Sequence, residues 1–449
     1  MKNTFKGGVH PHEGKELTEH ISIAPFGNPA QIAMLMSQHI GAICLPTVSK
    51  RQEVKAGEVI GASEAFVSAK IHSPVNGIVK DVCLWSHPVL GRVQAVIIDV
   101  AEGSAVKAQP QQSIYADFDI ETYSDAEILA AIKECGIVGM GGAGFPTNVK
   151  VGPNPQMPKE TMIVNACECE PYITCDYRVM LEWTKQFIAG VRLIKKASQC
   201  RTCYIGIEEN KPEAIKLLTD ELADCDDITV VSVKTKYPQG GERQLINAVL
   251  GVVVPTGKIP PMIGVLVCNV ATAAATAEAV IEKKPLTHRV VTVTGLGIKK
   301  PANLYVPVGT PVSALIDFCG GLTGDTVKVV LGGPMMGFSI GELSMPITKT
   351  TGSVLCLTRK EIGMAKFLGR QTSCIRCSRC LTVCPERLNP TKIAHCVKAD
   401  KLDLAEANNI SACMECGCCS YVCPANIELA GYIKTGKIRI ARAKQQKKA

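Results

Sequence analysis

The C-terminal part of the chain contains one cysteine spacing twice, first as Cys374-Ile-Arg-Cys377-Ser-Arg-Cys380-Leu-Thr-Val-Cys384-Pro385 and then as Cys413-Met-Glu-Cys416-Gly-Cys-Cys419-Ser-Tyr-Val-Cys423-Pro424. Three cysteines spaced in this way, with a fourth before proline, are typical of paired cubane [4Fe–4S] clusters, in which the fourth cysteine ligates the other cluster. The sequence therefore predicts two clusters. One is held by Cys374, Cys377, Cys380 and Cys423, and the other by Cys413, Cys416, Cys419 and Cys384.

Zinc is the competing interpretation of these motifs, because Cys-x2-Cys pairs also form tetrahedral thiolate sites. Zinc ribbons use two such pairs and do not need a third cysteine and a fourth before proline, twice over. The spacing therefore favours clusters, which pass single electrons. Residues 386–412, between the motifs, contain no glycine and have a broken helical stripe of apolar positions. We expect an all-helical two-cluster ferredoxin domain over residues 362–430.

Length and composition limit the class of protein. A chain of 449 residues is too long for one ordinary core, and 46% apolar with 20% charged residues is typical of globular domains. The 22 cysteines follow no apolar signal segment, so a reducing, cytoplasmic compartment is predicted. The most apolar stretch, residues 261–277, is shorter than the ~20 residues that a membrane span needs. We expect it to form a buried strand and helix.

Most of the net charge of +8 lies after residue 430, in a basic tail over residues 431–449. Its cations are Lys434, Lys437, Arg439, Arg442, Lys444, Lys447 and Lys448. A solvated terminal helix is the simpler interpretation, and docking to anionic lipid or to an acidic partner is the alternative. Nucleic-acid binding is not expected, since only 4% of the residues are aromatic.

After an N-terminal arm over residues 1–40, residues 41–110 show short β-like runs with glycine turns. Alternating apolar residues around Pro74 and the Asn76-Gly77 pair predict hairpins. The pattern resembles the biotinyl/lipoyl carrier barrel. Phe66 stands where carriers have their modified lysine, so we expect a structural barrel without a prosthetic arm.

Residues 120–286 alternate between helical and strand-like segments, beginning with a helix capped by Ser124. Strand-like segments start at Thr161, Cys203 and Ile228, and helical stretches cover 176–197 and 211–223. This order predicts a layered α/β domain with a largely parallel sheet. Residues 287–350 are β-rich with one helix and fit a small β-grasp domain. The predicted fold class is thus multidomain α/β.

A glycine-rich segment opens the α/β domain, Gly136-Ile-Val-Gly-Met-Gly-Gly-Ala-Gly-Phe-Pro-Thr-Asn-Val-Lys150. Its five glycines allow close approach to a phosphate or a ring, and their bare N–H groups can bind anions. The spacing is neither that of a dinucleotide-binding fingerprint nor that of a P-loop. Taken alone, this loop leaves a phosphate-bearing cofactor and a plain tight turn both open.

Four downstream segments complete a pattern: Asn165-Ala-Cys-Glu-Cys-Glu-Pro171, Tyr237-Pro-Gln-Gly-Gly-Glu-Arg243, Lys258-Ile-Pro-Pro-Met262 and Asn269-Val-Ala-Thr272. With the glycine loop, they resemble the flavoprotein subunit of respiratory complex I and of related hydrogenases over residues 125–345, including the β-grasp domain, called SLBB there. The resemblance implies FMN with NADH stacked on its ring. Implied FMN contacts are Gly139, Gly141, Gly142, Gly144, Lys150, Asn165, Glu168, Tyr237, Gly240, Asn269 and Thr272. Implied nicotinamide contacts are Phe145, Glu170, Glu242 and Lys258.

The whole chain resembles one family, the C subunits of Rnf complexes, which combine an N-terminal Phe-Lys-Gly-Gly-Val-His-Pro segment (here Phe5–Pro11), a barrel, a flavin domain, an SLBB domain and twin clusters. This resemblance implies the NAD(H)-reacting peripheral subunit of a membrane assembly that exchanges electrons between ferredoxin and NAD while moving Na⁺ or H⁺. The implied partners are integral membrane and iron–sulfur subunits. The implied location is the cytoplasmic face of the membrane.

The expected electron path runs from NADH through FMN and the two clusters to a partner. Hydride transfer to flavin needs no side-chain acid or base, so no catalytic residue is expected in the strict sense. Two other functions stay open: the diaphorase module of a soluble bifurcating enzyme, and an electron-relay subunit whose flavin fold no longer binds nucleotide. Cys167 and Gly241, which replace acids usual in the complex I family, keep the relay possible.

Overall fold

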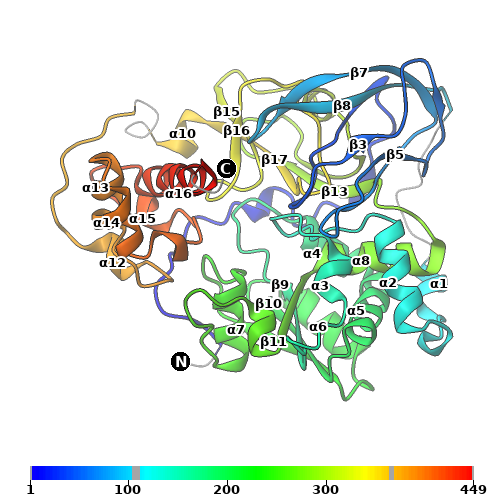
Figure 1. Cartoon of the computed structure of the whole chain (residues 1–449), viewed down its shortest axis with the longest axis horizontal. Helices are drawn as coiled ribbons and strands as arrows, with labels where there is room; N and C mark the ends of the chain where they lie inside the picture. The colour runs from blue at the N-terminus through cyan, green and yellow to red at the C-terminus, as the bar shows by residue number, and fades with distance from the viewer. Residues whose placement is uncertain (1–2, 104–111, 364–368, 447–449) are drawn as a thin grey trace.

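The structure is a computed structural model that describes residues 3–103, 112–363 and 369–446. Figure 1 shows an α/β domain in the lower part of the view, β-rich domains above it and a helical C-terminal domain at one side. This arrangement agrees with the predicted multidomain α/β fold class. The predicted ends of the barrel at residue 110 and of the tail at residue 449 lie outside the described residues.

The α/β domain is built on a parallel four-stranded sheet in the order β11-β10-β9-β12. Its strands are β9 (Thr161–Ala166), β10 (Thr202–Glu208), β11 (Ile228–Val233) and β12 (Val265–Asn269). Successive side chains of a strand point to opposite faces, so Met162 and Val164 join the core on one face and Ile163 joins the core on the other. The prediction of a parallel sheet is confirmed.

Helices cover both faces of this sheet. On one face α5 (Thr184–Ser198) packs on α8 (Val270–Ala277), and α7 (Glu242–Leu250) lies on the other. A Cβ atom at position 190 would collide with the carbonyl oxygen of Ala273, which explains why α5 contains Gly190. The remaining elements are α1 (Gln112–Ala116), η2 (Ile120–Thr122), α2 (Asp125–Glu134), α3 (Thr147–Val151), α4 (Cys175–Glu182), α6 (Pro212–Glu221), η3 (Pro260–Ile263) and η4 (Glu278–Glu282).

Local signals in this domain were mostly reliable. Ser124 caps α2 in a reciprocal capping box with Glu127, as predicted. Residues 261–277 contain β12 and the buried helix α8. The single helix expected over 176–197 is instead two helices, α4 and α5, because the chain bends at Trp183. The ring of Trp183 packs edge-to-face on Tyr305 of the next domain, a contact that helical periodicity does not encode.

The β-grasp domain has a six-stranded sheet in the order β1-β14-β13-β17-β15-β16. Its elements are β1 (Ile23–Pro25), β13 (His288–Thr294), β14 (Ala302–Pro307), α9 (Val312–Phe318), β15 (Thr326–Leu331), β16 (Phe338–Ile340) and β17 (Ser353–Thr358). The expected boundary at residue 350 is too early, since β17 is a fully buried strand between β13 and β15. The arm also contributes β1, which pairs in parallel with β14.

The barrel consists of two sheets, β2-β8-β7-β4 and β3-β5-β6. Its strands are β2 (Gln31–Leu35), β3 (Leu45–Pro46), β4 (Glu53–Val54), β5 (Val59–Ala62), β6 (Ile71–His72), β7 (Gly77–His87) and β8 (Gly91–Val100). No hairpin forms at Asn76-Gly77, because the chain there crosses from one sheet to the other; the long hairpin is β7–β8. The expected boundary at residue 40 is also wrong, since β2 pairs with β8.

Every element described after residue 369 is helical, as predicted. These elements are α12 (Arg379–Thr382), α13 (Pro390–Lys398), α14 (Leu402–Ala407), η5 (Ile410–Ala412), α15 (Cys418–Tyr421) and α16 (Leu429–Gln446), and α10 (Arg359–Ile362) precedes them. Of all helices in the described residues, none combines the length and apolar character that a bilayer span requires.

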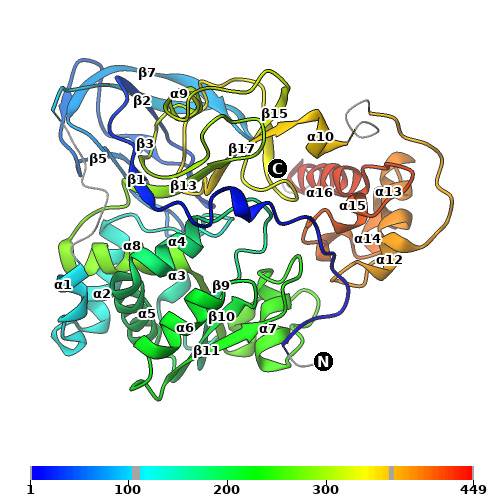
Figure 2. The ribbon, with the colours of Figure 1, turned by 180° about the vertical axis from the view of Figure 1, so that it is seen from behind.

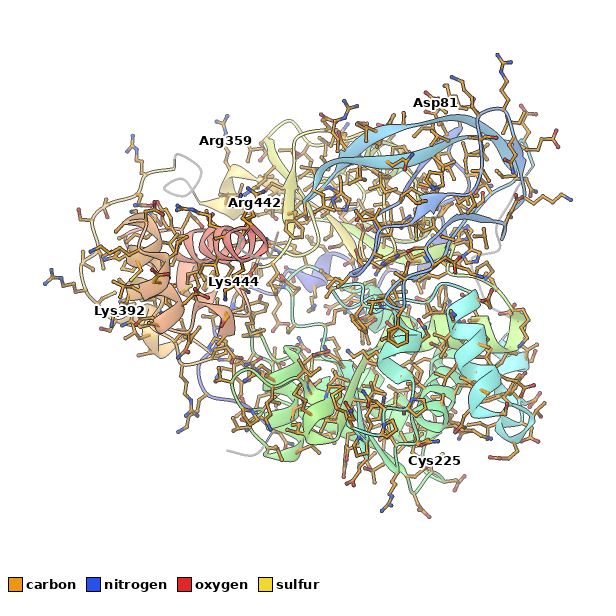
Figure 3. The ribbon with its side chains drawn as sticks, viewed as in Figure 1. Asp81, Cys225, Arg359, Lys392, Arg442 and Lys444 are labelled. Atoms are coloured by element: carbon orange, nitrogen blue, oxygen red, sulfur yellow. The ribbon has the colours of Figure 1, made fainter. Side chains whose placement is uncertain are left out.

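The basic tail is a packed helix and not the solvated one that we expected. Helix α16 begins before residue 431, and Ile433 and Ile440 are buried against α13 and η5. Three of its cations pair with acids of the same domain: Lys437 with Glu415 (2.6 Å), Lys444 with Glu406 (2.5 Å; Figure 3) and Arg439 with Asp400. Lys447 and Lys448 lie outside the described residues.

Candidate electron-transfer site

The glycine loop lies between α2 and α3. Hydrogen bonds from the Gly139 N–H to the Phe145 carbonyl (2.9 Å) and from the Gly144 N–H to the Gly139 carbonyl (3.1 Å) close it. A Cβ atom at Gly141 would lie 3.0 Å from the Cβ of Asn269, so a side chain there would push against Asn269. Gly142 has a φ of +152° and nothing within 4 Å of an added Cβ. The loop thus presents bare, exposed backbone to an open face, as a flavin cradle requires.

The loop faces the carboxyl edge of the sheet, where Asn165 is the next-to-last residue of β9 and Asn269 is the last residue of β12. In open α/β sheets, ligands bind at this edge where the strand order reverses. Asn269 caps α8 by accepting from the Thr272 N–H, and the Thr272 hydroxyl accepts from the Met140 N–H (2.9 Å) of the glycine loop. The Asn165 amide donates to the Gly240 carbonyl (2.7 Å). The structure therefore brings most of the predicted FMN contacts together.

Three other predicted contacts, Lys150, Glu242 and Lys258, lie in different surroundings. The Lys150 ammonium lies 2.7 Å from a Glu242 carboxylate oxygen, so a predicted FMN contact and a predicted nicotinamide contact pair with each other. Lys258 is exposed, and its backbone carbonyl accepts from Arg243 (3.1 Å), the neighbour of Glu242 in α7. Phe145 is half-buried, and its carbonyl closes the glycine loop.

Glu168 begins a tight loop that ends at the N-terminus of α4. Its φ is +47°, and its carboxylate accepts from the backbone N–H groups of Asp176 (2.6 Å) and Tyr177 (3.3 Å). Burial raises its pKa to about 7 although Lys15 opposes this shift. Asp176 in turn accepts from the Asn269 amide (2.6 Å). Ligand atoms of Glu168, Cys175 and Asp176 lie within 4.8 Å of one another, but these hydrogen bonds already use the two carboxylates.

Glu170, a predicted nicotinamide contact, points to the β-grasp domain. Its carboxylate accepts from the N–H groups of Met335 (3.2 Å) and Met336 (2.8 Å). Burial raises its pKa to about 7, and these hydrogen bonds act against the shift. In this arrangement Glu170 joins two domains. A direct contact with nicotinamide stays a prediction and would require one of these bonds to break.

Lys15 of the arm is a site residue that the sequence did not reveal. It is buried, and its three ammonium protons are taken by the carbonyls of Glu168 (2.8 Å), Glu170 (3.1 Å) and Ile173 (2.6 Å). Because all three N–H groups of this ammonium donate to the loop, Lys15 of the arm stabilises the conformation of residues 168–173 in the α/β domain. Nothing in the sequence distinguishes Lys15 from Lys6, an exposed lysine of the arm.

The two cysteine motifs have the same backbone. Positive φ values occur two, four and thirteen residues after the first cysteine of each motif. In the first motif these residues are Arg376, Ser378 and Arg387, and in the second they are Glu415, Gly417 and Asn426. The thiols of Cys384 and Cys423 accept from the N–H groups of Leu388 (3.3 Å) and Ile427 (3.4 Å). Because left-handed backbone is unfavourable for most residues, its repetition at non-glycine positions indicates two loops built for the same purpose.

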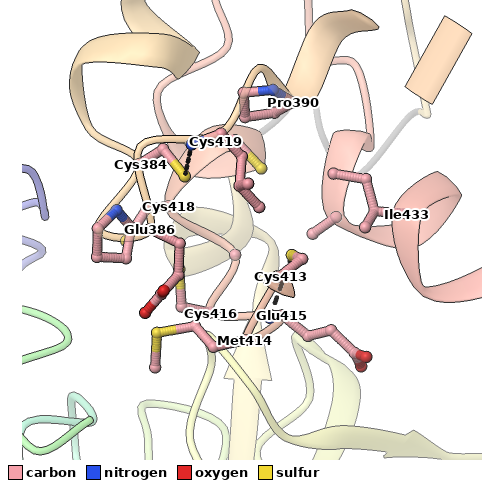
Figure 4. Close-up of a pocket in the computed structure, with 14 residues that line it drawn as sticks. Cys384, Glu386, Pro390, Cys413, Met414, Glu415, Cys416, Cys418, Cys419 and Ile433 are labelled. Atoms are coloured by element: carbon pink, nitrogen blue, oxygen red, sulfur yellow. Dashed lines mark hydrogen bonds between the residues drawn. The ribbon is translucent and has the colours of Figure 1, made fainter. Parts of the chain in front are cut away.

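A pocket lies between the second motif and residues 384–390 (Figure 4). The cysteines around it are Cys384, Cys413, Cys416, Cys418 and Cys419. Four of these are the ligands predicted for one cluster, including the one from the first motif. The donor set therefore fits a [4Fe–4S] cluster with crossed ligation. The Cys418 thiol instead lies 3.9 Å from the Tyr237 carbonyl.

The other predicted ligands lie in a neighbouring cluster of side chains. Cys380 and the half-buried Cys374 and Cys423 share one apolar cluster, which again joins the two motifs. Cys377, the fourth predicted ligand, is exposed at the surface of the domain. The ligand sets remain a prediction, and the grouping of these side chains agrees with it.

Tyr237 connects the flavin side to the second motif. Its hydroxyl donates to the Cys416 carbonyl (2.8 Å), and its backbone pairs with Val9 of the arm. Three residues further on, the Gly240 N–H donates to the Cys169 thiol (3.2 Å). The loop predicted to contact FMN therefore also contacts the second cysteine motif.

Three stretches of the chain match known families. Residues 3–102 match the RnfC barrel sandwich hybrid domain, residues 132–278 the Nuo51 FMN-binding domain and residues 290–339 the SLBB domain. Over 397 residues the chain is 41% identical to the C subunit of the proton-translocating ferredoxin:NAD(+) oxidoreductase complex of Clostridium ljungdahlii, a match that spans 88% of this chain and 84% of that protein. The chain belongs to the RnfC family.

A second RnfC relative is the C subunit of the Na(+)-translocating ferredoxin:NAD(+) oxidoreductase complex of Acetobacterium woodii. It is 37% identical over 406 residues and 90% of each chain. Among solved structures, an NAD+-reducing [NiFe]-hydrogenase matches in its air-oxidized and H2-reduced states, with TM-scores of 0.51 and 0.50 at 18% and 19% identity. These matches cover 66% and 74% of this chain and 57% and 64% of the hydrogenase chains, and they show a shared fold.

The comparisons confirm the predicted family and fold class. The barrel matches the RnfC barrel sandwich hybrid domain, and the α/β and β-grasp domains match the families that the resemblance implied. FMN as a cofactor is supported by the matched domain family and by the glycine cradle that the RnfC chain presents. The individual contact residues remain predictions.

Proposed function

We propose that this RnfC family member is the NAD(H)-reacting peripheral subunit of a ferredoxin:NAD⁺ oxidoreductase complex that moves Na⁺ or H⁺. One observation carries the proposal: Tyr237, on the loop expected at FMN, donates a hydrogen bond to Cys416 in the cysteine-lined cavity. The proposed two-electron and one-electron sites are thus in contact through Tyr237. A relay subunit without flavin would not need an open glycine cradle at this position.

In this proposal, some residues make room for FMN and others fix the backbone beside it. The glycines of residues 139–144 leave room for FMN, and Asn165, Asn269 and Thr272 fix the edge of the sheet beside it. When bound, FMN supplies the ability to accept a hydride and to release electrons singly. Oxidation of one NADH to NAD⁺ releases two electrons and one proton, so two one-electron acceptors are reduced for each NADH. The reverse balance applies when ferredoxin reduces NAD⁺.

The two clusters have different places in this scheme. We assign the flavin-side position to the cluster of Cys384, Cys413, Cys416 and Cys419, because Cys416 contacts Tyr237. The cluster of Cys374, Cys377, Cys380 and Cys423 takes the outer position, because Cys377 is exposed. Electrons then leave or enter the chain at the first motif.

Attachment to the membrane follows from the partners in this proposal. The protein binds other Rnf-type subunits, and its place is the cytoplasmic face, where NAD(H) is available. The cations of α16 contribute little to lipid binding, since three of them are paired within the domain.

The test is anaerobic titration of the reconstituted protein with NADH, followed by absorption and EPR spectroscopy. Bleaching of flavin and clusters together is the expected result. A chain that binds no FMN and whose clusters do not respond to NADH would instead be an electron relay. Flavin bleaching without any cluster reduction would refute the contact between the two sites as an electron path.

A further inference from the structure

The segment that contains the first cysteine motif is strongly basic, and its cations are exposed. The exposed cations between residues 369 and 392 are Arg370, Arg376, Arg379, Arg387 and Lys392 (Figure 3 labels Lys392 there). The one acid of this segment, Glu386, turns inward, where it meets Arg243 (3.2 Å) and Gln244 (2.8 Å). The surface around the motif is therefore positive without a compensating acid of its own.

These cations differ from those on α16 of the same domain. Lys437, Arg439 and Lys444 each pair with a carboxylate of the domain. Across residues 3–103, 112–363 and 369–446, no acid lies within ion-pair distance of the five cations at the first motif. Like charges that lie close together repel one another, which raises the free energy of the folded chain. A partner with the opposite charge relieves this repulsion, and the field of the charges attracts such a partner as it approaches.

The same segment exposes two apolar side chains and a predicted cluster ligand. Ile375 is 67% exposed and Leu381 is 37% exposed, and Cys377 is exposed between them in sequence. Interfaces typically combine an apolar centre with a polar rim and are enriched in arginine. An exposed ligand also brings its cluster close to whatever docks, and electron transfer weakens steeply with distance.

We propose that the surface formed by Arg370, Arg376, Arg379, Arg387 and Lys392 around Cys377, Ile375 and Leu381 docks an acidic iron–sulfur domain of a one-electron partner. This inference rests on the proposed function, because it places the electron exit at the first motif. Anionic lipid has the complementary charge but accepts no electron, so it gives no reason for a cluster ligand at the centre. An acidic redox protein explains both features.

The experiment uses the reconstituted full chain and a purified acidic two-[4Fe–4S] ferredoxin as the probe. In the variant Arg376→Glu/Arg379→Glu, binding of the probe measured by calorimetry should weaken at least ~10-fold at low salt. Binding to the wild-type chain should weaken as salt rises, because exposed charges are screened. Iron content and reduction of bound flavin by NADH should be unchanged.

The matched control is Lys299→Glu/Lys300→Glu, two exposed lysines of the β-grasp domain, which should leave ferredoxin binding unaltered. Equal losses in both variants would mean that only total charge matters, and the surface would not be a docking site. Vesicles containing phosphatidylglycerol test the lipid alternative; binding to vesicles but not to ferredoxin would overturn the proposal. The ferredoxin-binding measurement needs no NADH. If the proposed function were wrong, the NADH titration would fail while the binding result could still be obtained, so the two failures are distinguishable.

Discussion

The hydroxyl of Tyr237 donates a 2.8 Å hydrogen bond to the backbone carbonyl of Cys416, across the boundary between the α/β domain and the helical domain. The same boundary is tied by Val9 of the arm, which pairs with Tyr237, and by Gly8, whose N–H donates to the Val383 carbonyl (2.8 Å). Figure 2 shows the arm running past both domains. Tyr237 therefore joins the α/β domain to the second cysteine motif, and the arm joins Tyr237 to the first motif.

Replacing Tyr237 by phenylalanine tests the importance of this contact. The buried Cys416 carbonyl would lose its partner at a cost of ~1–3 kcal/mol, and the two loops would be held less tightly. FMN and iron content should stay normal, while cluster reduction after NADH mixing slows in stopped-flow absorption. Tyr204→Phe is the control for a tyrosine on β10 away from the boundary. An unchanged rate of cluster reduction would show that the hydrogen bond is dispensable.

Replacing Gly142 by valine should expel FMN. The space above its α-carbon is open in this structure, and a branched side chain would occupy it, so we expect at least ~10-fold weaker FMN binding, or ~1.4 kcal/mol. Iron content should not change. Gly91→Val is the matched control, since Gly91 also has positive φ and open space but lies on the β7–β8 turn. Normal flavin stoichiometry in Gly142→Val would contradict the cradle.

Replacing Cys384 by serine should damage the cluster that the second motif holds. The Cys384 side chain lines the cavity together with Cys413, Cys416 and Cys419, so iron content should fall by about half. EPR should show the loss at the second motif. Cys396→Ser, in α13 and outside both predicted ligand sets, should keep full iron content. If the signal of the first motif disappeared instead, the crossed ligation would be incorrect.

Replacing Lys15 by methionine should destabilise the flavin site, although Lys15 lies in the arm and outside the α/β domain. Lys15 holds residues 168–173, and this loop contacts Gly240 through Cys169 and Asn269 through Glu168 and Asp176. We expect ~10-fold weaker FMN binding, measured by fluorescence, and faster amide exchange in residues 168–173. Lys284→Met removes a partly buried lysine from its pair with Glu278, remote from the site. Equal FMN loss in both variants would indicate general destabilisation only.

The pH dependence of stability should report Glu170. Burial raises its pKa from the ordinary 4.5 to about 7, so between these values the folded chain keeps a proton that the unfolded chain has released. The free energy of unfolding then falls as pH rises through this window, by up to ~1.4 kcal/mol per pH unit.

The corresponding variant is Glu170→Gln, which removes this titration. Its melting temperature relative to wild type should therefore increase from pH 6 to pH 8. Glu53→Gln changes an exposed glutamate of β4 and should follow the wild-type profile. Parallel profiles for Glu170→Gln and wild type would exclude a buried carboxyl with a raised pKa.

Much of the site was predictable because its signals are local. The cysteine spacing predicted a cavity joining Cys384 to the second motif, since the loop around each cluster is fixed by neighbours in sequence. The glycine loop, the cap at Ser124 and the parallel sheet followed from spacing and periodicity in the same way. Family resemblance then supplied the expected contacts on the sheet edge.

The errors concern contacts between distant segments. The arm was expected to end at residue 40, yet it contributes β1 to one sheet and β2 to another. A two-strand pairing depends on which edge is available in the folded domain, and no short pattern shows this. The tail was expected to be solvated, but Ile433 and Ile440 find a core that exists only after α13 and η5 have packed.

By itself, the sequence determined the chemistry of this RnfC chain: thiolates spaced for two clusters, a bare glycine loop for a flavin and an α/β sheet to hold it. Only the tertiary structure decided how these parts meet, through the Tyr237–Cys416 contact, the buried Lys15 and the unpaired cations around the first motif. Ligand spacing depends on residues that are close together in the sequence. Contact, burial and charge pairing arise between residues far apart in the chain, so they appear only when it folds.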